Sequence, residues 1–65
     1  MTESELIDVV NEWAAEDPAF RYQLQQSVAN KNLSQIRKLI DRVTEQIDQS
    51  INSETIDRVI EWFFE

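Results

Sequence analysis

The sequence predicts an all-α fold, a small bundle of four short helices. The 65 residues include no glycine and a single proline, a composition that disfavours β-hairpins because their favoured turns require glycine at positive φ. Apolar residues recur three and four positions apart, which is the period of an amphipathic helix, and nowhere alternate over a sustained stretch. Short polar stretches divide this pattern into four segments. We therefore expect helices at about 3–16, 18–30, 33–51 and 54–64, in one domain spanning residues 1–65.

The first two predicted helices are delimited by capping residues. Thr2, with Glu5 three residues later, forms a capping-box pattern at the start of the first helix. This helix is expected to stop near Asp17, because a residue that precedes proline is pushed out of the α region. The same dipeptide is expected to start the second helix, since aspartate is a good N-cap and Pro18 suits the first helical position.

The third predicted helix has the most regular apolar face. Asn32 and Gln35 repeat the capping pattern at its start. At about 100° per residue, its apolar side chains fall within an arc of about 120°. They are Ile36, Leu39, Ile40, Val43, Ile47 and Ile51. The periodicity therefore extends this helix to about residue 51, and Ser53 is expected to cap the fourth helix.

The two ends of the chain resemble each other. Residues 4–16 read SELIDVVNEWAAE and residues 53–65 read SETIDRVIEWFFE, with eight of the thirteen positions identical. In each copy an isoleucine and a valine point to one side, while an aspartate and a glutamate point to the other. The similarity is explained either by the few residue types that suit a capped acidic helix or by duplication of a helix.

The copies differ at the positions that widen the apolar face of the last helix. Ile60 and Phe64 stand where the first copy has Asn11 and Ala15, and the apolar arc of the last helix spans about 200°, more than a surface helix needs. This helix therefore either lies in the middle of the bundle or meets another chain.

The widened face is the predicted partner-binding site. It comprises Ile60, Glu61, Trp62 and Phe64, with Ile60 and Phe64 as the apolar surplus. Trp62 and Phe63 also match the face that Trp13 uses in the first copy, so we expect them to pack in the core. Tryptophan is nevertheless enriched among interface hot spots, which leaves a contact role open for Trp62.

Composition excludes most enzymatic chemistry. The chain has no histidine and no cysteine, the usual participants in nucleophilic and zinc chemistry. Without glycine it also lacks the familiar phosphate-binding loops. We therefore expect no enzyme, no cofactor and no metal site. A domain this small must then rely on helix packing or on homodimerisation for its stability.

Charge further restricts the partners. Thirteen acidic and six basic residues give a net charge of −7, which repels nucleic acid and anionic lipid. Asp8 with Glu12, and Asp57 with Glu61, place paired carboxylates on one helix face, opposite the apolar stripe. We interpret these pairs as a solvated acidic ridge rather than as a cation site.

Basic residues gather on the third predicted helix. Arg37, Lys38 and Arg42 form the main basic patch. We expect this patch to pair with the acidic ridge, within the chain or across a dimer, and each exposed pair contributes only about 0 to 1 kcal/mol.

The leading hypothesis is a non-enzymatic protein–protein interaction module, which binds a protein partner or a second copy of itself. The alternative is an acidic inhibitor whose carboxylates mimic nucleic acid phosphates in a basic groove of a partner. Salt separates the two, because a mimic loses affinity steeply with ionic strength and apolar docking does not. The start of the chain lacks a positively charged, apolar signal segment and no stretch has the length of a membrane span, so we expect a cytoplasmic protein.

Overall fold

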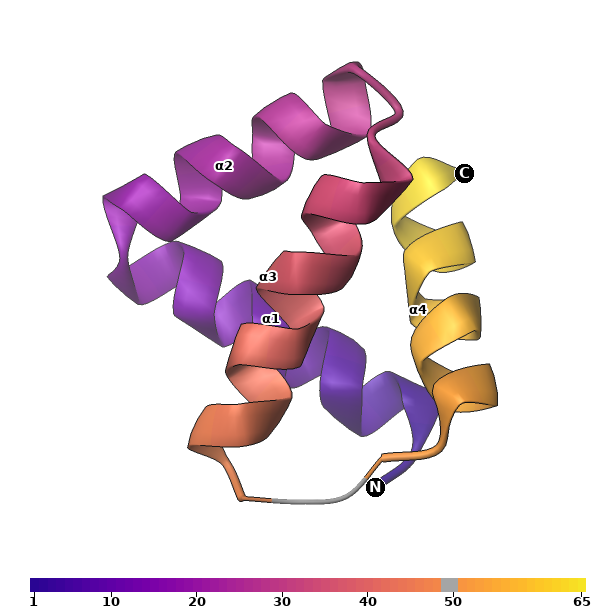
Figure 1. Cartoon of the computed structure of the whole chain (residues 1–65). Helices are drawn as coiled ribbons and strands as arrows, with labels where there is room; N and C mark the ends of the chain where they lie inside the picture. The colour runs from indigo at the N-terminus through magenta and orange to yellow at the C-terminus, as the bar shows by residue number, and fades with distance from the viewer. Residues whose placement is uncertain (49–50) are drawn as a thin grey trace.

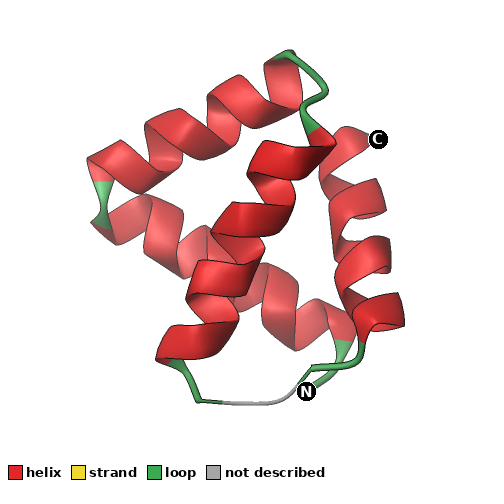
Figure 2. Ribbon diagram, viewed as in Figure 1, coloured by secondary structure: helices red, strands yellow, loops and turns green. Residues whose placement is uncertain are grey.

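The computed structural model describes residues 1–48 and 51–65, and these form four helices (Figure 1). They are α1 (Glu3–Glu16), α2 (Pro18–Ala29), α3 (Leu33–Gln46) and α4 (Ser53–Phe64). Figure 2 shows helices joined by short loops throughout this part of the chain. The predicted all-α bundle is confirmed.

The caps that the sequence predicted are present at the helix starts. The Thr2 hydroxyl accepts a hydrogen bond from the Glu5 amide at 3.2 Å. An oxygen of Asp17 accepts from the amides of Ala19 and Phe20 at 3.0 and 3.3 Å. A side chain two or three residues away thus satisfies amides that have no partner inside their own helix.

The two later caps follow the same chemistry. The Asn32 side chain accepts from the Gln35 amide at 3.1 Å, as predicted. At α4 the cap is Asn52 rather than the expected Ser53, and its side chain accepts from the Glu54 amide at 2.8 Å. The one-residue differences at the end of α2 and the start of α4 lie within the usual uncertainty of helix boundaries.

The predicted extension of the third helix to residue 51 is wrong. Helix α3 ends at Gln46, Ile47 is its C-cap, and Asp48 has a φ of 52°. Aspartate tolerates this left-handed conformation better than most residues, and the Asp48 amide donates to the Glu45 carbonyl at 3.2 Å. Ile51 continues the apolar period, yet it packs against the core from outside the helix. Residues 49 and 50 of the predicted helix lie outside the described residues.

Helix α2 ends in a Schellman motif built without glycine. Lys31 has a φ of 52°. Its amide donates to the Val28 carbonyl at 3.2 Å, and the Asn32 amide donates to the Ser27 carbonyl at 2.9 Å. These are the two hydrogen bonds of the motif, which usually places glycine where Lys31 stands.

We expect Lys31→Gly to stabilise the domain by about 1 kcal/mol, because a non-glycine residue in the left-handed region costs roughly 1 to 2 kcal/mol. Urea unfolding at constant slope measures the change. Lys38→Gly is the matched control, since Lys38 is exposed in the middle of α3 and loses the same charge. There we expect about 1 kcal/mol of destabilisation. If the two variants changed the free energy of unfolding in the same direction, the role assigned to Lys31 would be contradicted.

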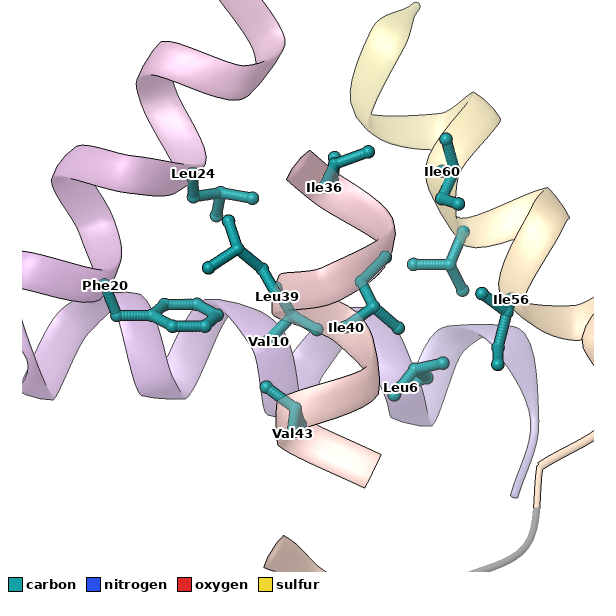
Figure 3. Packing of buried hydrophobic residues seen from close by; sticks show 11 residues of the cluster. Leu6, Val10, Phe20, Leu24, Ile36, Leu39, Ile40, Val43, Ile56 and Ile60 are labelled. Atoms are coloured by element: carbon teal, nitrogen blue, oxygen red, sulfur yellow. The ribbon is translucent and has the colours of Figure 1, made fainter. Parts of the chain in front are cut away.

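The four helices share one apolar core (Figure 3). Helix α1 packs on the other three, and α3 packs on α2 and α4 as well. In Figure 1, α1 crosses behind α3 rather than running alongside it as in an up-and-down bundle. The buried core residues are Leu6, Val10, Phe20, Leu24, Ile36, Leu39, Ile40, Val43, Ile56, Val59 and Ile60. Helix α3 thus supplies the largest share, in agreement with its regular apolar face.

None of the helices in residues 1–48 and 51–65 has the length and apolar character needed to cross a bilayer.

Candidate interaction surface on the C-terminal helix

The two copies of the sequence repeat bury different faces. With the isoleucine of each copy at 0° and about 100° per residue, the buried residues of α1, Leu6 and Val10, lie at about 260° and 300°. The buried residues of α4 are Ile56 at about 0°, Val59 at about 300° and Ile60 at about 40°. The buried face of α4 is therefore rotated by about 70° relative to that of α1.

This rotation corrects the expected role of Ile60. Its side chain is only 4% exposed and belongs to the core. Figure 3 shows it on the side of α4 that faces Ile36 of α3. Helix α4 packs on both α1 and α3, so the wide apolar arc is covered largely within the chain. Ile60 does not add an exposed apolar surface as the sequence suggested.

The expected burial of Trp62 in the core is wrong as well. The tryptophan of each copy lies at about 240°, which is about 40° from the centre of the buried face in α1 but about 110° from it in α4. Trp13 is partly buried and meets the Phe20 ring in an edge-to-face contact, with centroids 5.6 Å apart. Trp62 is 50% exposed, so it lies at the surface rather than in the core.

Phe63 connects Trp62 to the core, whereas Phe64, which was expected with Ile60 in the exposed apolar surplus, is partly buried. Phe63 and Phe64 are half-buried and pack against the core cluster. The Trp62 and Phe63 rings form an edge-to-face pair with centroids 5.0 Å apart and an interplanar angle of 89°. One side of Trp62 is therefore supported by Phe63, while half of its surface remains open to solvent.

A shallow hollow of about 340 Å³ surrounds Trp62, and we call it the tryptophan hollow. Its lining residues are Glu3, Arg58, Glu61, Trp62 and Glu65. Arg58 donates hydrogen bonds to Glu3 at 3.2 Å and to Glu54 at 2.8 Å. The hydrogen bond to Glu3 and the charge of Glu54 raise the pKa of Arg58 above its usual value. Among the described residues, Glu61 and Glu65 form no such ion pair.

A second hollow, of about 430 Å³, lies between α3 and α4, and we call it the leucine hollow. Its lining residues are Leu33, Ser34, Arg37, Asp57, Ile60 and Glu61. Leu33 is 60% exposed. Arg37 forms an ion pair with Asp57 across the hollow, and both side chains are about half exposed, so the pair contributes little to stability. Glu61 lines both hollows and thus lies between them.

We define the α4 surface by four exposed residues of the two hollows: Leu33, Glu61, Trp62 and Glu65. Sequence reasoning missed Leu33. Its helical angle is at the edge of the α3 arc, and it is the first residue of the helix. An apolar residue directly after the Asn32 cap is a signal that could have been used.

The acidic ridge is divided by the fold. Asp8 and Glu12 are exposed on α1 and form no ion pair among the residues described, whereas Asp57 pairs with Arg37. The expected pairing of the basic patch is thus present for Arg37, and in the described part of the chain it does not extend to Lys38 or Arg42. Among the described residues, carboxylates without an ion pair lie on α1, on α3 and just after it, and at the end of α4.

The described residues contain no cluster of three or more acidic, histidine or cysteine side chains that could hold a metal ion. Comparison of the chain with protein family models, with curated proteins and with solved structures finds no match.

Proposed function

We propose that this chain is a non-enzymatic protein–protein interaction module that binds its partner through the α4 surface. The observation that carries the proposal is the half-exposed Trp62. A domain of this size needs most of its large apolar side chains for its own core. A tryptophan that packs on Phe63 yet remains half exposed to solvent is the kind of residue that dominates binding energy at interfaces. Leu33 offers a second apolar contact on the other side of Glu61.

The placement of the carboxylates supports a role without catalysis. Asp8, Glu12, Asp57 and Glu61 are all exposed to solvent. Acid–base catalysis by carboxylates depends on burial or close pairing that separates two pKa values, and a solvated helix face provides neither.

The acidic row of α1 supports mimicry of nucleic acid as a second candidate. Glu5, Asp8, Glu12 and Glu16 are exposed and form no ion pair among the described residues. With a rise of about 1.5 Å per residue, they provide one charge per about 5 Å, which is sparser than the roughly 3.4 Å per phosphate of one DNA strand. We therefore rank this candidate below binding through Trp62.

The test is photo-crosslinking from position 62. The photoreactive residue benzoylphenylalanine, which keeps a large aromatic side chain at the anchor position, replaces Trp62 in one variant. It replaces Tyr22 in the control variant, because Tyr22 is 54% exposed on α2. In cells that make the protein, we expect one discrete crosslinked product from position 62 and none from position 22. A product that contains a second copy of the chain identifies the partner as the chain itself, and sedimentation equilibrium then gives the dimer.

Crosslinking no stronger at position 62 than at position 22 would overturn the proposal. A third probe at Asp8 tests mimicry. If a crosslinked product formed only from position 8 and disappeared as ionic strength rose, the result would support charge-driven binding through α1 instead of docking on the α4 surface.

A further inference from the structure

We infer that the partner segment bound at the α4 surface is basic, and that one of its arginine side chains lies on the Trp62 ring beside Glu61 and Glu65. This inference rests on the proposed function and adds the chemistry of the partner. Three properties of the tryptophan hollow carry it: its charge, its exposed ring and its size.

The hollow is negatively charged. Three carboxylates, those of Glu3, Glu61 and Glu65, face one guanidinium, that of Arg58. The guanidinium is already engaged by Glu3 and Glu54, so it does not neutralise Glu61 or Glu65. The whole chain carries −7, and its field favours approach of a cationic segment while it repels an acidic one.

The ring and the carboxylates are positioned for the same cation. At about 100° per residue, Glu61 lies about 100° from Trp62 around the α4 axis, on its solvent side, and Glu65, the C-cap residue directly after α4, lines the same hollow. A cation over the face of tryptophan is attracted by the ring quadrupole. A planar guanidinium can stack on the ring and also donate to a carboxylate beside it, which a lysine ammonium does less well.

The size of the hollow limits the occupant. Its volume of about 340 Å³ is at the low end of the roughly 300 to 1,000 Å³ of small-molecule sites. It is open to solvent and suits one long side chain that arrives with a larger partner surface. Leu33 lines the leucine hollow on the other side of Glu61, so it is available to contact an apolar residue of the same partner segment.

The experiment uses a defined probe, a blocked twelve-residue peptide of alternating arginine and alanine, with a glutamine–alanine peptide for comparison. Two-dimensional NMR of the ¹⁵N-labelled protein follows the indole N–H signals. We expect the Trp62 signal to shift saturably with the arginine peptide, while the Trp13 signal, from the partly buried ring, serves as an internal reference.

Two charge variants localise the binding. Glu61→Gln with Glu65→Gln is expected to weaken binding about tenfold, since each exposed pair is worth up to about fivefold. Asp8→Asn with Glu12→Gln removes the same charge from α1 and is expected to change the affinity less than twofold. All four side chains are exposed, so both variants should fold. Trp62→Ala in the protein should remove most of the remaining affinity.

Equal loss in the two charge variants would overturn the inference, because the attraction would then be to net charge alone. An equal Trp62 shift with the glutamine–alanine peptide would overturn it too. The crosslinking experiment distinguishes failure of this inference from failure of the proposed function. A specific crosslink from position 62 to a neutral or acidic segment would refute the basic partner segment and still support an interaction module. Absence of any specific crosslink would refute the interaction module itself.

Discussion

Ile60→Asp is expected to unfold the domain. The side chain is 4% exposed, between α4 and α3, within the shared core. An unpaired carboxylate at this place loses its hydration and gains no partner, which costs several kcal/mol in addition to the lost apolar packing. At about 0.05 to 0.15 kcal/mol per residue, a chain of this length has only about 3 to 10 kcal/mol of stability. Far-UV circular dichroism at 25 °C and urea unfolding measure the result.

Leu33→Asp is the matched control, because Leu33 lines the same hollow as Ile60 but is 60% exposed. It is also the first residue of α3, where a negative charge interacts favourably with the helix dipole by about 0.3 to 1 kcal/mol. We expect the stability of this variant to change by less than about 1 kcal/mol. A folded Ile60→Asp protein would contradict the assigned burial and restore Ile60 as a residue available to a partner.

The helices and their starts could be predicted because the interactions that set them are local. Asp17 caps α2 through amides two and three residues away, and Asn32 caps α3 through the Gln35 amide. Side chains and amides at such separations meet in any protein that contains the motif. Neither interaction requires knowledge of what the helix packs against.

The end of α3 could not be predicted by the same means. The apolar period runs on through Ile47 and Ile51, but the backbone leaves the helix at Asp48. Ile51 reaches the core from the loop instead. Hydrophobic periodicity reports that a residue is buried, and it does not distinguish burial within a helix from burial just beyond it.

The exposure of the α4 side chains was predicted wrongly for a related reason. The sequence led us to expect Ile60 at the surface and Trp62 in the core, and the structure has the reverse, with Ile60 4% and Trp62 50% exposed. Which edge of a 200° apolar arc remains open depends on where α1 and α3 lie around α4. That arrangement arises from contacts far apart in the sequence, and the similarity of α4 to α1 favoured the wrong analogy between Trp62 and Trp13.

Trp13→Ala is expected to destabilise the domain by about 2 to 3 kcal/mol. Complete burial of an aromatic side chain makes its truncation cost about 3 to 5 kcal/mol, and Trp13 is partly buried. Its edge-to-face contact with Phe20, at 5.6 Å, is lost as well. For a domain of this size the melting temperature should fall by roughly 10 to 20 °C, which calorimetry measures.

Trp62→Ala makes the same substitution at the equivalent position of the other copy. Trp62 is 50% exposed and rests mainly on Phe63, so we expect a loss of less than about 1 kcal/mol. Both tryptophans are followed by two apolar residues and preceded by a glutamate, so local helix propensity differs little between the sites. A difference between the two losses therefore measures the rotation of the buried face in α4 relative to α1. Equal losses would place Trp62 in the core and remove the aromatic anchor from the α4 surface.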